Sequence, residues 1–253
     1  MEVYHKRHHD MSEVKGNYWK HYLFEFLMLF LAVTSGFFVE NLREHSSEHK
    51  REKQYIQSLA EDLKIDASQL TAYIQFNNST IAYCDSLQFD IMHGDVFKKS
   101  NDFYDHCREL ARYVRYYPTD RTMEQLKNGG NMRLIRKWNV SNAITDYDRQ
   151  TRFMTEVDMQ LKEENAKYRN YLVEFLDGSS YDRLNRPGSF MDTAIRTKGN
   201  PAFIDNDEKK LKIIYNEAFS LKILFNSSNT SATNVVREAK DLLLLLQKEY
   251  GIK

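Results

Sequence analysis

The stretch HSSEH at positions 45–49 is the pattern whose residue types and spacing could do the most chemistry. It matches the H-x-x-E-H pattern of one zinc-protease class, in which two histidines one helical turn apart bind metal and the glutamate acts as base. The stretch begins six residues after an apolar segment that ends at Val39, so a cleft would have to form against lipid headgroups. We therefore treat His45, Glu48 and His49 as weak metal candidates on a solvated helix and expect no enzyme activity.

Three arginines form a second candidate constellation. Arg108, Arg112 and Arg115 are spaced by four and three residues, which places them on one face if the segment is helical. The surrounding segment 101–137 has more basic than acidic residues, so an anion or an acidic partner could bind there. The alternative is a solvated face opposite an apolar seam, and the sequence leaves both interpretations open.

The chain has two cysteines, Cys84 and Cys107. Each occupies an apolar seam position, and the midpoint between them falls at the Gly94-Asp95 break between two expected helices. Residues equidistant from the turn of an antiparallel pair lie at the same height, so we expect the two side chains to face each other. We expect two buried reduced thiols even in an exported domain, and a disulfide is the alternative.

The composition limits which scaffold could position these residues. The chain has 253 residues, 36 Lys+Arg and 36 Asp+Glu, and a net charge of zero. Nucleic-acid binders usually have a basic excess, so we expect no nucleic-acid partner. Only 9 Gly and 3 Pro are present, too few for an architecture of strands and turns. The composition therefore predicts an all-α fold built from long helices, and it suggests no cofactor.

Residues 22–39 form an apolar segment whose only charge is Glu25. As a helix it would span roughly 27 Å of a hydrocarbon layer about 30 Å thick, which predicts one transmembrane helix. A cleaved signal peptide is the rival interpretation, but the helical pattern continues past Gly36. Ala32 and Gly36 form a small-x-x-x-small pair at which two such helices could pack, and such pairs also arise by chance.

The orientation in the membrane is harder to predict, because Lys and Arg are equally frequent on both sides of the span. We expect a short basic tail (1–21) inside a bacterial inner membrane and a periplasmic C-terminal domain. That domain would follow a helical stalk (40–62) whose alternating acids and bases indicate a solvated helix.

Residues 63–253 show heptad spacing, which predicts an antiparallel bundle with coiled-coil packing. A seam from Leu63 to Ile91 contains one polar residue, Asn77, which either fixes the helix register or faces a wet gap. We expect a hairpin with a second helix over 101–117, ended by Pro118. Further helices are expected over 119–128, 141–177, 211–225 and 235–246, with a polar turn at 226–230 and an irregular segment, 179–205, as a ligand or partner edge.

Two stretches carry a family resemblance: EKQYIQSLAEDLKIDASQL (52–70) and RTMEQLKNGGNMRLIRK (121–137). Together with the short basic tail, the single span and the closing Leu-rich helix, they resemble a family of single-span membrane proteins of Bacteroidota, classed as domain of unknown function number six thousand and ninety. The chain departs from the family pattern at Ala32, where Gly is frequent, and at Tyr147, where a Tyr-Tyr pair is frequent. The resemblance implies an envelope protein of unassigned activity and supplies no catalytic residues.

Two functions from different classes are compatible with these features. The first is a non-enzymatic, membrane-anchored interaction or scaffold protein that assembles with itself or with another envelope protein. The second is a ligand-sensing bundle in which 179–205 and the arginine face enclose a small anion and signal through a partner. An arginine-lined pocket would favour the sensor.

Overall fold

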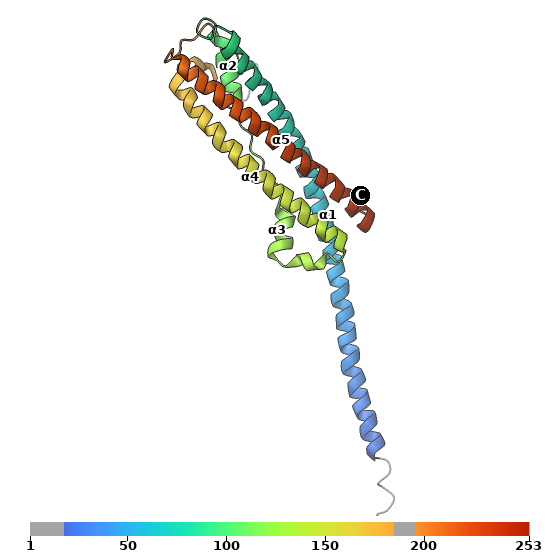
Figure 1. The fold of residues 1–253 in the computed structure, drawn as a ribbon. Coiled ribbons are helices and arrows are strands. Elements are labelled where there is room, and N and C mark those ends of the chain that lie inside the picture. The colour runs from blue at the N-terminus through green and yellow to red at the C-terminus, as the bar shows by residue number, and fades with distance from the viewer. Residues whose placement is uncertain (1–17, 185–195, 253) are drawn as a thin grey trace, which may run out of the picture. The chain divides into compact units, whose positions relative to one another are not determined.

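A computed structural model of the chain describes residues 18–184 and 196–252. Over these ranges the helices are α1 (Tyr18–His93), α2 (Ser100–Leu110), α3 (Arg121–Asn128), α4 (Trp138–Phe175) and α5 (Glu208–Tyr250), with short 3-10 helices η1 (Asn131–Leu134) and η2 (Gly178–Leu184) (Figure 1). The same ranges contain no β-strand, only an isolated bridge between Leu176 and Phe203. The predicted all-α class is confirmed. Residues 1–17 of the predicted basic tail lie outside the described residues.

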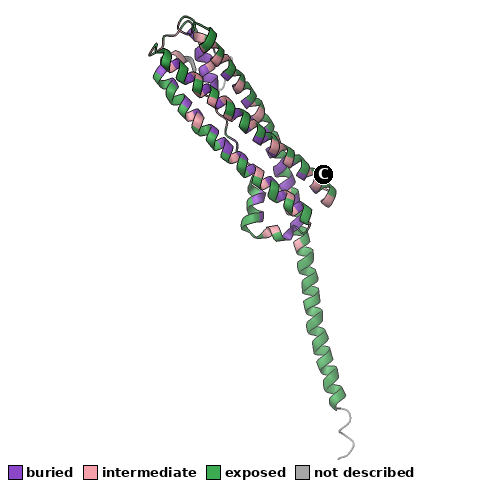
Figure 2. Ribbon diagram, in the orientation of Figure 1, coloured by how far each residue is buried: buried purple, intermediate pink, exposed green. Residues whose placement is uncertain are grey.

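The chain divides into two compact units, residues 1–53 and 54–253. In the first unit, α1 contains a segment long and apolar enough to cross a membrane, and residues 22–39 are exposed throughout (Figure 2). Ser35 Oγ donates a hydrogen bond to the carbonyl of Leu31 at 2.7 Å, so this hydroxyl is satisfied within the helix. A Cβ at Gly36 would meet nothing within 4 Å, so the surface beside Ala32 and Gly36 is uncovered in the single chain.

The second unit begins earlier than the heptad pattern suggested. Ile56 and Leu59 are 0% and 2% exposed and belong to its hydrophobic core. Residues 54–62, which we expected in the stalk, are therefore part of the bundle. The acid-base alternation that suggested a solvated stalk lies at 40–52, within the first unit.

Helices α4 and α5 run antiparallel to each other beside the bundle part of α1, and α4 runs in the same direction as α1 (Figure 1). Their apolar positions recur every three or four residues and form the buried sides of the helices. These side chains belong to two separate hydrophobic clusters. One contains Leu63, Leu70, Ile144, Met154, Val235 and Leu242. The other contains Leu87, Phe103, Leu161, Tyr168, Leu221 and Phe225.

A layer of buried polar side chains separates the two clusters. On each of α1, α4 and α5, these polar residues fall in the sequence between the residues of one cluster and those of the other. The Tyr73 hydroxyl donates to Asp158 Oδ1 at 3.0 Å and lies 2.7 Å from Ser228 Oγ. Asn77 Nδ2 donates to Asn229 Oδ1 at 3.0 Å. Of the two interpretations of Asn77, the structure supports the register device, because the amide pairs with a specific side chain on α5.

The predicted turn at 226–230 is wrong, because α5 continues through it as one helix. The polar residues that suggested a turn belong to the polar layer or are satisfied within the helix. Ser228 is fully buried against Tyr73, while Thr230 Oγ1 donates to the carbonyl of Asn226 at 3.0 Å. Without Gly or Pro in the stretch, nothing breaks the helical backbone.

The second predicted helix is also too long. Helix α2 ends at Leu110, whose carbonyl accepts a hydrogen bond from Asn165 Nδ2 at 3.2 Å. The segment after it is non-helical, which lets Tyr113 reach Asp158 Oδ2 at 2.6 Å and Tyr116 enter the first cluster. These tertiary contacts and the weak helix propensity of aromatic and β-branched residues explain the early end.

Helices α1 and α2 form the predicted antiparallel hairpin. His106 Nδ1 lies 2.7 Å from Asp90 Oδ2, and the rings of Tyr83 and His106 are 6.1 Å apart between centroids. These contacts join the last turns of α1 to α2 across the short connection 94–99.

Candidate functional site

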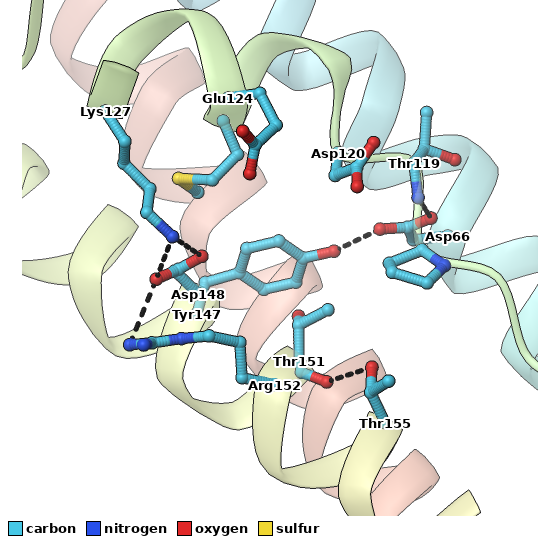
Figure 3. Close-up of a pocket in the computed structure, with 12 residues that line it drawn as sticks. Asp66, Thr119, Asp120, Glu124, Lys127, Tyr147, Asp148, Thr151, Arg152 and Thr155 are labelled. Carbon is cyan, nitrogen blue, oxygen red and sulfur yellow. Dashed lines mark hydrogen bonds and ion pairs between the residues drawn. The ribbon is translucent and has the colours of Figure 1, made fainter. Parts of the chain in front are cut away.

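A pocket of about 120 Å³ opens between α1, α3, α4 and the segment that precedes α3 (Figure 3). It lies within the second unit. Its lining is a mixture of apolar side chains with acidic, basic and hydroxyl groups. The lining residues are Asp66, Pro118, Thr119, Asp120, Met123, Glu124, Lys127, Tyr147, Asp148, Thr151, Arg152 and Thr155.

Asp66 is the buried acid at the inner end of this pocket, with 1% of its surface exposed. Its Oδ1 accepts a hydrogen bond from the backbone N–H of Thr119 at 2.8 Å, and its Oδ2 accepts one from the Tyr147 hydroxyl (Figure 3). Burial, together with the negative charge of Asp66, raises the pKa of Tyr147 far above its ordinary value. The phenol therefore stays a donor at physiological pH, and it joins α4 to α1.

Lys127 and Arg152 meet on Asp148 at another side of the pocket. Lys127 Nζ lies 3.1 Å and 3.2 Å from the two carboxylate oxygens, and an Arg152 terminal nitrogen lies 3.2 Å from Oδ2 (Figure 3). Both basic groups of the lining are therefore occupied by one carboxylate. Asp120, which precedes α3, and Glu124 on α3 are exposed at the mouth.

The hydroxyl of Thr151 is a polar group of the pocket whose hydrogen-bonding capacity is not used. Thr151 is 8% exposed, and its Oγ1 has no partner in hydrogen-bonding geometry among the residues that the structure describes, although it lies near the Tyr147 hydroxyl and acts to lower the pKa of that phenol. Figure 3 shows this hydroxyl below the Tyr147 ring, on the pocket side of α4. A buried hydroxyl without a partner costs about 1–3 kcal/mol, so its retention calls for an explanation.

Helix α3 is fixed to α1 by a second acid, Asp62. Arg121 Nε lies 2.6 Å from Asp62 Oδ1, and the backbone N–H of Thr122 donates to Oδ2 at 3.2 Å. The helix ends at the Gly129-Gly130 break, where Gly130 has a φ of +61°. These contacts place Asp120 and Glu124 opposite α4.

The weak zinc candidates are all on α1 in the first unit. His49 Nδ1 lies 3.2 Å from Glu52 Oε2. Within 18–184 and 196–252, no three His, Cys, Asp or Glu side chains are grouped so that they could hold a metal ion. The structure does not bring His45, Glu48 and His49 together as a ligand set.

The predicted arginine face is not formed, because Arg112 and Arg115 lie beyond the end of α2. Arg108 donates to Glu109 Oε1 at 2.8 Å, and Arg112 donates to Oε2 of the same buried carboxylate at 2.6 Å. Arg115 lies over the Tyr117 ring, 4.7 Å from its centroid. Pairing with Glu109 reduces the positive charge of Arg108 and Arg112 that an anion would need. Arg115, however, lines a separate pocket of about 510 Å³ together with Tyr73 and Phe76. The three-arginine face is therefore not formed, but an arginine-lined pocket of the kind that favours the sensor hypothesis is present at Arg115.

Cys84 and Cys107 are both buried free thiols in the second hydrophobic cluster. Burial raises the pKa of Cys84 to about 12 and raises that of Cys107 as well. The Tyr168 hydroxyl donates to the Cys107 carbonyl at 3.4 Å. The structure thus corresponds to the reduced form.

The irregular segment lies partly outside the described residues, at 185–195, while its other parts pack against α2. Thr197 Oγ1 donates to Asp105 Oδ1 at 2.7 Å, and Ser100 Oγ donates to Asn200 Oδ1 at 3.0 Å. Phe203 packs among aromatic rings, 4.8 Å from Phe175 and 5.8 Å from Phe103 between centroids. Residues 196–203 therefore cover the end of the core.

Sequence reasoning missed the pocket because its members looked like ordinary seam residues. Tyr147 and Thr151 fall at seam spacing on the helix expected over 141–177, between the buried Ile144 and Met154. Asp66 falls on the observed buried face of α1 between Leu63 and Leu70, at heptad spacing. An acid at such a position is the signal that could have identified it.

Comparisons of the chain with protein-family models, curated proteins and solved structures found no match. The assignment of function therefore depends on the geometry described above.

Proposed function

We propose that this protein is a non-enzymatic, single-pass membrane protein of the bacterial envelope whose helical bundle associates with a second copy of itself. The observation that carries the proposal is a set of exposed apolar side chains on α1 and α5, here called the apolar ridge. It consists of Phe89, Met92, Phe219 and Ile223, which are 63%, 63%, 53% and 53% exposed. Clustered exposed apolar residues are typical of protein interaction surfaces.

Side-chain contacts between the helices locate this apolar ridge. The ammonium of Lys222 on α5 pairs with the carboxylate of Asp85 on α1. Phe89 follows Asp85 by one turn, and Phe219 precedes Lys222 by three residues, so both aromatic residues lie within about one helical turn of this ion pair. Met92 and Ile223 extend the ridge by a further turn on each helix.

A second copy is the occupant that the anchor favours. Residues 22–39 would confine all copies to one membrane. Their bundles would then lie in a thin layer beside it, where their effective concentration is higher than in free solution. The uncovered surface beside Ala32 and Gly36 would allow their membrane helices to approach closely as well. A weak apolar contact between bundles is then sufficient for association.

The test compares two double variants of the full chain in lipid nanodiscs and in native membranes. Phe89→Ser with Phe219→Ser removes the centre of the ridge. Phe153→Ser with Val173→Ser removes two exposed apolar residues of α4 and serves as the control. We expect chemical cross-linking to yield a dimer of the wild type and of the control, and at least a tenfold smaller dimer fraction for the ridge variant. Equal cross-linking of all three, or a monomeric wild type at native density, would contradict the proposal.

The anchor and the orientation are tested separately. Alkaline carbonate should leave the protein in the membrane pellet, and N-terminal sequencing of the mature protein should find residues before position 22. Protease added to spheroplasts should degrade the bundle if it is periplasmic, as we propose. A mature N-terminus after Gly36 would instead identify a cleaved signal peptide.

A further inference from the structure

The geometry points to a second binding function in the pocket of Figure 3. The Asp66–Tyr147 pocket takes a small alkylammonium ion, with its charged group on Thr151 and the carboxylates of Asp120 and Glu124 and its alkyl part on Met123 and Pro118. This site is independent of the proposed self-association. It lies among α1, α3 and α4, whereas the apolar ridge is on α1 and α5.

The charges of the lining favour a cation. Four carboxylates line the pocket, against the two basic groups of Lys127 and Arg152, which both bind Asp148. Asp120 and Glu124 are at the mouth, the first at the residue that precedes α3 and the second on α3. Their negative charge would attract a cation and, once it is bound, remain close to it.

The hydrogen-bonding groups of the pocket favour an ammonium donor. The Thr151 Oγ1 is nine-tenths buried and without a hydrogen-bond partner among the described residues, and Figure 3 shows it on the pocket side. The Tyr147 oxygen gives its proton to Asp66 and keeps lone pairs that can accept. An N–H donor would satisfy these oxygens. The Thr151 hydroxyl could also donate to an anion, but the carboxylates of the lining would repel a carboxylate or phosphate.

The size and apolar part of the pocket favour a short alkyl chain. A volume of about 120 Å³ is slightly smaller than an apolar cavity of about 150 Å³ that holds benzene, so a ligand of about five heavy atoms fits. Met123, Pro118 and the Tyr147 ring supply apolar surface beside the oxygens. A ligand this small binds weakly even in a well-matched site, and we expect a Kd of about 1 mM.

The experiment uses n-butylammonium as the probe, added to the full chain in nanodiscs with ¹³C-labelled methionine methyl groups. Met123 lines the pocket, so its methyl signal reports on the site. Met154 in the core and Met159 on the surface serve as reference signals elsewhere in the bundle. We expect the Met123 signal alone to shift and to saturate. 1-Butanol and butyrate, which have the same alkyl chain without the positive charge, should leave it unchanged.

Two variants test the oxygens that the proposal uses. Thr151→Val should weaken n-butylammonium binding about tenfold and raise the melting temperature, because it removes a buried hydroxyl that has no partner in the free protein. Asp120→Asn with Glu124→Gln should weaken binding about tenfold. The charge-matched control, Asp146→Asn with Glu163→Gln on exposed positions of α4, should bind as the wild type does.

The remaining outcomes overturn the proposal. An unshifted Met123 signal at 20 mM n-butylammonium would rule out the site. An equal shift with 1-butanol would identify an apolar void, and an equal shift with butyrate would identify an anion site at Lys127 and Arg152. Unchanged binding by the Thr151→Val variant would contradict the role of the hydroxyl.

Discussion

The hydroxyl of Tyr147 on α4 donates a hydrogen bond to the buried carboxylate of Asp66 on α1, 81 residues earlier in the chain. The same carboxylate accepts the backbone N–H of Thr119, just before α3. One buried acid thus joins three segments around the pocket. A charge with 1% exposure is tolerated because donors from two directions satisfy it.

Replacing Tyr147 with Phe should destabilise the bundle by about 1–3 kcal/mol, because Asp66 would keep its burial and lose a donor. Urea unfolding of the full chain in detergent, followed by circular dichroism, measures the change. Tyr117→Phe is the matched control, since Tyr117 is 64% exposed. An equal decrease in the free energy of unfolding in both variants would show that the Tyr147–Asp66 hydrogen bond does not stabilise the bundle measurably.

Gly130 should tolerate Asn better than Ala, because its φ of +61° lies in the left-handed region. We expect Gly130→Ala to cost about 1–2 kcal/mol and Gly130→Asn clearly less. Gly178→Ala provides a control, since Gly178 has neither a positive φ nor a neighbour within 4 Å of an added Cβ. Thermal unfolding of the three variants ranks them, and equal costs at both positions would contradict the backbone argument.

Burial raises the pKa of Asp158 above its ordinary 3.8, although Tyr73 and Tyr113 both donate hydrogen bonds to it. The folded protein therefore binds this proton more readily than the unfolded chain does. The contribution of Asp158 to stability is then greatest below pH 3.8 and falls as the pH rises through the higher folded value. We expect the free energy of unfolding of the wild type, minus that of Asp158→Asn, to decrease from pH 4 to pH 7. A flat or rising difference would contradict this sign.

The sequence predicted the elements whose signals are local and periodic. The heptad spacing predicted a long helix over 141–177. Its apolar residues Leu161, Tyr168 and Phe175 are all buried on α4. The structural role of polar residues was harder to predict. A serine such as Ser228 can indicate a turn, or it can be buried in a helix when a partner such as Tyr73 lies opposite it. The pocket was missed for the same reason. Asp66, Thr119 and Tyr147 lie far apart in the chain, and only the packing of three helices brings them together.

Replacing His45 and His49 with Ala should leave both the fold and the metal content unchanged. No described group of side chains is arranged to hold a metal, and His49 contacts Glu52 on the same helix. Elemental analysis of purified wild type and double variant, together with circular dichroism, provides the test. One equivalent of zinc in the wild type that disappears in the variant would establish a metal site at these residues.

Cys84 and Cys107 should resist alkylation in the native protein and react only after unfolding. Both side chains are fully buried, and burial raises the pKa of Cys84 to about 12, so almost no thiolate forms at pH 7.4. Iodoacetamide labelling followed by mass spectrometry measures this, with Ser79→Cys as an exposed comparison thiol. We expect the thiol at position 79 to be labelled at least a hundredfold faster. Non-reducing peptide mapping of native membranes completes the test: a Cys84–Cys107 linked peptide would contradict the reduced state and would place the bundle in an oxidising compartment.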